Sequence, residues 1–212
     1  MGNQTTSAAP AGTASTRERL LDAAAQLFYE QGINVGVDAV CRAAGVSKRS
    51  MYQLFASKED LVAASLERSA PGYAAALLPA PDDGRPPRER MLHVFERLEY
   101  LESVQDFLGC PFVATAVQAK SPTHPASVIA RRQKDGLTSF FHHEAQRGGA
   151  RDPELLARQL TLVFDGASAR SVVQAQVLDG LAVTTANSLM DVAGIGPSLP
   201  GNDVTTPAKT TA

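Results

Sequence analysis

The 212-residue sequence predicts an all-α fold in which three to four short helices precede a larger helical bundle. Two observations support this prediction. Apolar residues recur with the 3.6-residue period of a helix throughout the chain, whereas β-branched residues never alternate with polar ones over more than a few positions. A run rich in proline and glycine, 79–87, interrupts the pattern and separates the two halves.

The helices of the first half are delimited by recognisable capping residues. Ser15-Thr-Arg-Glu18 has the spacing of a capping box, and the helix that it opens is expected to end at Gly32. Two short helices should follow over about 37–44 and 48–54. Ser57 caps a fourth helix, which we expect to bend or stop near Pro71-Gly72.

The second half is expected to form one helical bundle. Its helices are predicted over about 88–105, 111–119, 125–146, 153–177 and 181–192. Within 160–178 the only charges are Asp165 and Arg170, which would be costly in lipid, so this stretch is a buried helix and not a membrane span. An isologous dimer would cover it, the last two helices of each protomer forming a four-helix bundle. The residues expected at this dimer interface are Leu160, Val163, Phe164, Ala167 and Val172.

Four segments follow from these patterns. We expect a disordered tail over 1–14, a first domain over 15–72, a second domain over 86–193 and a disordered tail over 194–212. The first sixteen residues contain neither a charge nor an apolar run, so no signal peptide is expected. The protein should therefore be cytoplasmic.

The charge of the chain is locally concentrated. A net charge of -2 excludes nucleic-acid binding through bulk positive charge, but four basic residues and no acid lie between Cys41 and Lys58. Gly45 ends one short helix and Ser47 caps the next, which predicts a helix-turn-helix. Its second helix should present Lys48, Arg49, Ser50, Tyr52 and Gln53 to a DNA major groove, while Met51, Leu54 and Phe55 hold it to the protein body.

Residue patterns for catalysis or metal binding are weak. Cys41 and Cys110 fit neither a CxxC metal site nor a disulfide framework, and we expect both to be small buried hydrophobes. His142-His143 point about 100 degrees apart and lack a partner at i+4, so no metal is expected. Ser168 resembles a nucleophile elbow only superficially, because no strand precedes it. No nucleotide-binding loop occurs, and we expect neither a cofactor nor an enzyme activity.

The residues of the helix-turn-helix resemble the tetracycline-repressor (TetR) family of transcriptional regulators. About 50 residues carry this resemblance, namely Arg19-Leu-Leu-Asp-Ala-Ala24, Leu27-Phe28 with Gly32, Val40 with Ala43-Ala-Gly-Val-Ser47, Met51-Tyr52 with Phe55, and Ser57-Lys-Glu-Asp-Leu61. A weaker resemblance to some members involves Gly109-Cys-Pro-Phe112 and Asp152-Pro-Glu-Leu155.

The resemblance implies a homodimer that binds a pseudo-palindromic DNA operator with its amino-terminal helices. It implies that Ser47 caps the recognition helix, that Lys48, Arg49, Ser50 and Gln53 face the groove, and that Tyr52 and Lys58 reach phosphates. The charge distribution of the sequence itself adds Arg42 to the expected DNA-binding cluster. Two positions depart from the family. Gly36 stands where a capping Thr is usual, and Asp38 stands where a basic or neutral residue is common. We expect that Asp38 points away from DNA or is neutralised by Arg42, four residues along the same face.

The resemblance also implies a small-molecule pocket in the carboxy-terminal bundle. The apolar residues on the helices that line it in the family are Phe95, Leu98, Phe107, Phe112, Ala116, Leu137, Phe141 and Phe164. Within 91–117 only Arg97 is a lysine or arginine embedded among the apolar stripes, which favours a neutral or lipophilic effector.

The sequence therefore predicts a sequence-specific DNA-binding regulator, a repressor that a small-molecule effector releases from its operator. An activator, or a regulator without an effector, would use the same DNA-binding module and would be favoured by a filled core without a cavity. A helical-bundle enzyme is the distant alternative, and it would need titratable residues that converge in one cleft.

Overall fold

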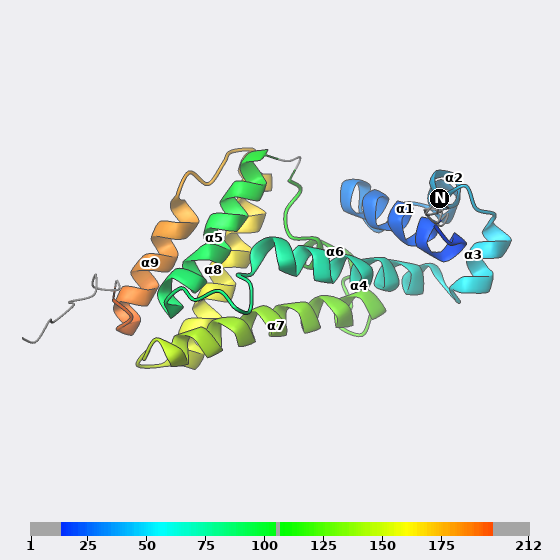
Figure 1. Cartoon of the computed structure of the whole chain (residues 1–212). Coiled ribbons are helices and arrows are strands. Elements are labelled where there is room, and N and C mark those ends of the chain that lie inside the picture. Colours follow the sequence, from blue (N-terminus) through cyan, green and yellow to red (C-terminus); the bar gives the residue numbers. More distant parts are fainter. Residues whose placement is uncertain (1–13, 105–106, 197–212) are drawn as a thin grey trace, which may run out of the picture. The chain divides into compact units, whose positions relative to one another are not determined.

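A computed structural model describes residues 14–104 and 107–196. The described residues form nine helices and no strand, which confirms the predicted all-α fold (Figure 1). The helices are α1 (Thr16–Gln31), α2 (Val37–Ala44), α3 (Lys48–Leu54), α4 (Lys58–Leu77), α5 (Pro87–Val104), α6 (Pro111–Ala119), α7 (Pro125–Arg147), α8 (Pro153–Gln174) and α9 (Leu181–Ala193). Apart from Ala14 and 194–196, the two predicted tails lie outside the described residues.

The chain divides into two compact units that are not contiguous in sequence. The first unit contains the residues up to Pro71 together with Pro111–Arg132, and the second contains Gly72–Cys110 together with the residues from Gln133 on. This division differs from the predicted domains, because α6 and the start of α7 belong with the helix-turn-helix. A side chain of α6 bonds the turn after α1, and a side chain of α7 bonds α4, pairings that local sequence patterns do not reveal.

In the first unit, the start of α1 is stabilised by the predicted capping box. The Ser15 hydroxyl accepts a hydrogen bond from the Glu18 N–H at 3.2 Å, and the Glu18 carboxylate accepts one from the Ser15 N–H at 2.7 Å. Hydrogen bonds to the Glu18 carboxylate from the backbone and the side chain of Ser15 lower the pKa of Glu18. The buried face of α1 consists of Leu20, Leu21, Ala24 and Phe28.

Of the two outcomes predicted for α4 near Pro71-Gly72, a bend or a stop, the structure excludes the stop. The helix continues to Leu77 with Pro71 inside it. Ala70 and Leu77 are both buried, so packing on either side of the proline offsets the missing backbone hydrogen bond. The three alanines before Leu77 favour a helix, and the Arg97 guanidinium donates a hydrogen bond to the Ala76 carbonyl at 2.9 Å near its end.

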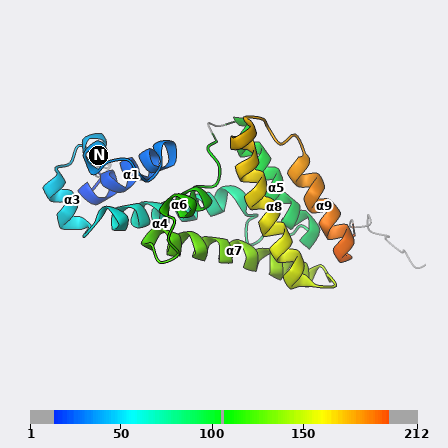
Figure 2. The ribbon, with the colours of Figure 1, turned by 180° about the vertical axis from the view of Figure 1, so that it is seen from behind.

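In the second unit, α5, α8 and α9 pack side by side, as Figures 1 and 2 show from opposite directions. The core between the helices is aromatic and aliphatic. The rings of Phe95 on α5 and Phe141 on α7 stack with their centroids 5.7 Å apart, and Leu98, Leu160 and Phe164 are also fully buried. This core accounts for the apolar stripes of the second half of the sequence.

Two carboxylates of α5 hold the connection between α8 and α9. The Glu99 carboxylate accepts hydrogen bonds from the N–H groups of Gly180, Ala182 and Val183 at 2.9 to 3.2 Å. The Glu102 carboxylate accepts one from the Leu178 N–H at 3.2 Å. Helix α9 has no capping side chain of its own, so Glu99 supplies the acceptor that its first turn needs.

The connector that precedes α5 is organised by buried charge. Arg90 donates hydrogen bonds to the carbonyls of Ala80 and Asp83, at 3.0 and 2.8 Å, and pairs with Glu144 of α7 at 2.9 Å. Arg90 and Glu144 are both buried, and Arg147 makes a second ion pair with Glu144. The run 79–87 is thus an ordered connection that belongs to the second unit.

Candidate nucleic-acid interface

Helices α2 and α3 form a helix-turn-helix. Gly45 adopts a left-handed conformation at the end of α2, with φ 65°, and its N–H bonds to the Arg42 carbonyl. Ser47 then caps α3, since its hydroxyl accepts a hydrogen bond from the Ser50 N–H at 3.1 Å. The turn between the two helices therefore has the capping chemistry that the sequence predicted.

The outward face of α3 is polar. Met51 and Phe55 are buried, whereas Lys48, Arg49, Tyr52 and Gln53 are exposed. Ser50 is half-buried and its hydroxyl lies 2.9 Å from that of Ser47, so it is already engaged in the cap. This surface offers two kinds of group that can read base edges, a guanidinium and an amide.

Leu54 does not hold α3 to the protein body, and that part of the prediction is wrong. Its side chain is 42% exposed. The chain leaves the helix at Phe55, which has the extended values φ -136° and ψ 127°, and this turns the Phe55 ring inward. Phe55 is 6% exposed, so of Leu54 and Phe55 only Phe55 packs against the protein body as predicted.

The carboxylate of Asp38 is paired with Lys48 rather than with Arg42. The Lys48 ammonium lies 2.8 Å from a carboxylate oxygen of Asp38, and both side chains are more than half exposed. The hydrogen bond to Asp38 raises the pKa of Lys48. The turn at Gly45 brings the start of α3 beside the start of α2, so the neutralising cation comes from the next helix and not from Arg42, which is exposed.

Lys58 lies at the start of α4. Ser57, immediately before it, accepts a hydrogen bond from the Asp60 N–H at 3.0 Å and donates one to the Asp60 carboxylate at 2.8 Å. Lys58 itself is half-buried. A helix start of this kind presents free N–H groups, so an ammonium beside it suits a DNA phosphate.

Arg17 is a cation that our sequence-based interpretation missed. Its guanidinium lies over the Phe55 ring, 5.4 Å from the centroid, so the start of α1 reaches the end of α3. The side chain is exposed and extends the basic surface of the helix-turn-helix. A signal existed in the sequence, because Arg17 and Arg19 lie in the first turn of a helix, where the helix dipole disfavours cations.

The residues predicted to line an effector pocket are distributed over both units. Phe112 and Ala116 belong to the first unit, and the other six belong to the second. Phe95, Leu98, Phe141 and Phe164 are fully buried core residues, whereas Phe107 and Leu137 are half-buried. Of these residues, the structure brings Phe95 and Phe141 into direct ring contact.

The structure places most of the predicted dimer residues inside the protomer. Leu160, Phe164 and Ala167 are buried against neighbouring helices of the same chain, so they do not offer a free surface to a partner. Val163 is half-buried and Val172 is 45% exposed. The exposed apolar residues of α8, α9 and their connection are Leu155, Leu162, Val172, Val173, Val177, Leu181 and Val192.

The other chemistry-bearing residues do not assemble. Both cysteines are reduced and buried, as predicted, and burial raises the pKa of the Cys41 thiol. Within residues 14–104 and 107–196, no three His, Cys, Asp or Glu side chains lie close enough to hold a metal ion. None of the helices in the same ranges is both long enough and apolar enough to cross a bilayer.

The helix-turn-helix exposes a basic recognition helix, and helices make up most of the other described residues. This arrangement is that of a DNA-binding regulator. Comparison with known proteins agrees. Residues 20–65 match the family model for bacterial regulatory proteins of the tetR family. The solved structure of a candidate TetR transcriptional regulator from Streptomyces avermitilis is 55% identical, covers 86% of this chain and 100% of that one, and superposes with a TM-score of 0.84.

The chain belongs to the TetR family, whose members are transcriptional regulators and not enzymes. A TetR-family regulator from Streptomyces coelicolor has the same fold, with 22% identity, a TM-score of 0.77, and coverage of 84% of this chain and 95% of that one. The HTH-type transcriptional regulator YjdC of Escherichia coli is 26% identical over 110 residues. That match spans 52% of this chain and 56% of YjdC, about half of each.

Proposed function

We propose that this protein is a dimeric repressor that binds a pseudo-palindromic operator and is released from it by a small molecule. The observation that carries the proposal is the outward face of α3, where Arg49 and Gln53 are exposed on a helix held by Met51 and Phe55. Such a helix fits the major groove of DNA. An operator-binding protein of a bacterial family would act in the cytoplasm.

In this proposal the contacts divide by chemistry. Arg49 bonds guanine edges and Gln53 bonds adenine edges, because these pairings are bidentate. Tyr52, Lys58 and the newly identified Arg17 contact phosphates, which positions the helix without reading sequence. Lys48 contributes less than a free lysine would, since Asp38 holds its ammonium.

A second copy of the chain is proposed to pack on the exposed apolar residues of α8 and α9. Leu162 and Val173 are 73% and 77% exposed, which is costly for aliphatic side chains on one long helix. Pairing α8 and α9 across a two-fold axis would bury them. Two recognition helices related in this way could enter successive major grooves, about 34 to 36 Å apart.

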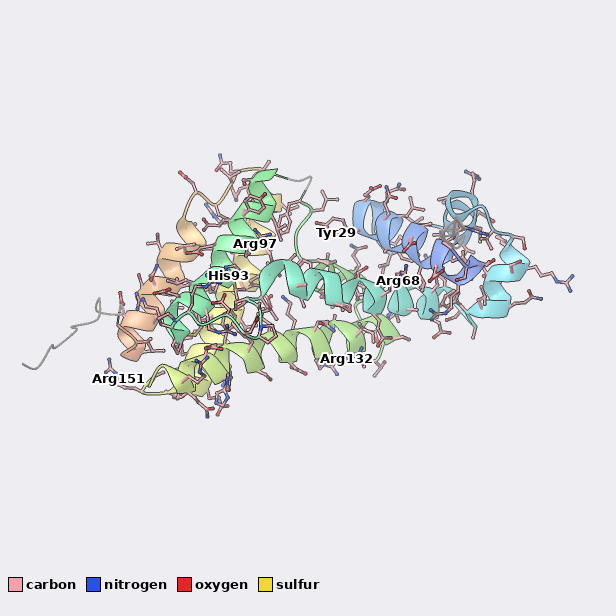
Figure 3. The ribbon with its side chains drawn as sticks, in the orientation of Figure 1. Tyr29, Arg68, His93, Arg97, Arg132 and Arg151 are labelled. Atoms are coloured by element: carbon pink, nitrogen blue, oxygen red, sulfur yellow. The ribbon has the colours of Figure 1, made fainter. Side chains whose placement is uncertain are left out.

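The effector is proposed to bind within the second unit and to be neutral or lipophilic. The cations on or beside its described core are already engaged. Lys134 pairs with Asp165 and lies 4.6 Å from the Phe164 ring centroid, and Arg97 bonds the Ala76 carbonyl and lies over Tyr100. Figure 3 marks Arg97 and His93 on α5. Binding would favour a state in which the recognition helices are no longer spaced for successive grooves.

Footprinting of the protein on DNA from its own genomic neighbourhood, with and without candidate lipophilic compounds, tests the proposal. We expect a protected palindrome that at least one compound releases. Protection that no compound alters would favour the alternative, a regulator without an effector. Absence of any protected palindrome, at protein concentrations up to the micromolar range, would contradict operator binding itself.

A further inference from the structure

A side chain of α6 bonds to the turn between α1 and α2. The Gln118 amide oxygen accepts a hydrogen bond from the Ile33 N–H at 2.9 Å, across 85 positions of sequence. Ile33 is only 9% exposed, so water has little access to this part of the turn. A buried N–H without an acceptor is costly, and Gln118 supplies the acceptor here.

The preceding residue, Gly32, is suited to this contact in two ways. It ends α1 with φ 83°, a conformation that residues with a side chain rarely adopt. A Cβ atom at this position would also collide with the Gln118 amide oxygen. The glycine therefore both allows the turn and makes room for the amide of α6.

The turn that Gln118 holds leads directly into the helix-turn-helix. After the Ile33 N–H, the described turn has one backbone hydrogen bond, from the Val35 N–H to the Gly32 carbonyl at 3.3 Å. Helix α2 then starts at Val37, and its N-cap residue, Gly36, provides no capping side chain. The start of α2 therefore lacks the side-chain acceptors that fix α1 and α3, and its placement depends on the preceding turn, which Gln118 holds at Ile33.

Two other ion pairs lie in the first unit, one within its first 71 residues and one between these and 111–132, and both are exposed. Arg68 of α4 pairs with Asp22 of α1 at 2.9 Å, and Arg132 of α7 pairs with Glu67 of α4 at 2.5 Å (Figure 3). Exposed ion pairs contribute little to stability. The Gln118 bond to a buried amide is the stronger of the described polar links between 111–132 and the first 71 residues.

We propose that Gln118 is a positioning residue for DNA binding, which fixes the turn that places α2 and thereby the recognition helix. The inference rests on the proposed operator binding. It assigns a role in DNA recognition to a residue that lies 60 positions or more beyond the helix-turn-helix and touches no DNA. Loss of the amide oxygen should release the Ile33 N–H and loosen the start of α2.

The test compares four variants of the full-length protein. Gln118→Met keeps the length of the side chain but removes the acceptor, and Gln118→Glu keeps an acceptor oxygen. Gln26→Met is the matched control, because Gln26 lies on the exposed face of α1 and bonds only the exposed Glu30. Hydrogen exchange at the Ile33 amide, operator affinity, affinity for random DNA and the thermal midpoint are measured for each.

We expect Gln118→Met to speed exchange at Ile33 and to weaken operator binding about tenfold, with a smaller loss on random DNA. Gln118→Glu should keep both the exchange rate at Ile33 and the operator affinity near those of the wild type. Gln26→Met should also behave as the wild type. Gly32→Ala, which displaces the amide, should reproduce the loss. If Gln118→Met lowered only the thermal midpoint and kept operator affinity, the residue would be structural and the inference would be wrong. A wild-type protein that bound no operator would overturn the proposed function, and the inference with it.

Discussion

At the recognition helix, the carboxylate of Asp38 limits the charge that Lys48 offers to DNA. The two side chains are paired at 2.8 Å while both remain largely exposed to solvent. Asp38→Asn should therefore free the ammonium and remove a negative charge near the phosphates. We expect tighter binding to operator and random DNA alike, and a slope of log affinity against log salt that is steeper by up to about 2 per dimer.

Asp22→Asn is the matched control for this prediction. It removes the same charge from an ion pair with Arg68, on α1 and α4 instead of on the helix-turn-helix. Fluorescence anisotropy over a salt series measures both variants. An equal gain in affinity from the two substitutions would mean that net charge alone matters and that the Asp38 pair has no special position.

Contacts that read sequence should behave differently from contacts that hold the backbone. Lys58 lies at a helix start and would attract phosphate without base information. Lys58→Ala should weaken specific and random binding to similar degrees and make the salt slope shallower by about 2 per dimer. Arg49→Ala or Gln53→Ala should instead cost about 1 to 3 kcal/mol on the operator with little loss on random DNA.

The affinities of each variant for operator and for random DNA are measured over the same salt series. The comparison separates residues that read the base sequence from residues that hold the DNA backbone. A Lys58→Ala protein that lost only operator preference and kept its salt slope would reverse the assignment.

Glu102 should make the folded protein less stable as pH rises, which is opposite to the usual effect of a carboxylate. Burial raises its pKa, and one of its oxygens is buried without a described hydrogen-bond partner. Because the folded pKa lies above the unfolded one, protonated Glu102 favours the folded state, and this contribution is lost as pH rises through the folded pKa. Glu102→Gln should therefore raise the thermal midpoint at pH 8.

The gain from Glu102→Gln should shrink as pH falls toward the ordinary carboxyl value of about 4.3, where both proteins carry a neutral group. Thermal unfolding between pH 4 and pH 8 measures it. The substitution keeps an oxygen to accept the Leu178 N–H, so a constant difference across this range would point to packing and not to charge.

At the scale of helices, Glu99 does for α9 what Ser15 and Ser47 do for their own helices. Its carboxylate accepts three N–H groups around the start of α9. Glu99→Ala should leave these donors without their acceptor and cost about 1 to 3 kcal/mol of unfolding free energy. Chemical denaturation measures the loss, and Glu96→Ala, an exposed residue one turn earlier on α5, is the control. Equal effects of the two substitutions would contradict the capping role.

Local chemistry explains which helices could be predicted and which could not. The starts of α1, α3, α4 and α8 follow from Ser or Asp caps that bond within three residues, so the sequence alone specifies them. The passage of α4 through Pro71 depends on burial of Ala70 and Leu77, which no local pattern contains. The pairing of Lys48 with Asp38 likewise needs the turn geometry that places two helix starts together.

At the scale of the whole molecule, substitutions on the exposed apolar surface of α8 and α9 test whether this surface forms the proposed dimer interface. Leu162→Glu or Val173→Glu would place a charge where a second subunit is proposed to pack, and should convert the dimer to a monomer at micromolar concentration. Val117→Glu is the control, because Val117 is 67% exposed on α6 of the first unit. Sedimentation velocity measures the outcome. If a protein with both Leu162→Glu and Val173→Glu still sedimented as a dimer, the interface would lie elsewhere.

The sequence could not distinguish the core of the second unit from its outer surface. Along 160–178 nearly every residue is uncharged, so Phe164 and Leu162 are equally suited to a buried position. In the structure Phe164 is fully buried, whereas Leu162 is 73% exposed. Which face a neighbouring helix of the same chain covers depends on tertiary packing, and so does the assignment of α6 to the first unit.

The discontinuity of the first unit has a consequence for protein engineering. The chain leaves this unit after Pro71 and returns to it at Pro111. A chimera that joined residues 1–71 to an unrelated sensor module would lack Gln118, and Ile33 would lose its acceptor. We therefore expect that a DNA-binding module transferred from this regulator needs both stretches of sequence, 1–71 and 111–132, to keep its operator affinity.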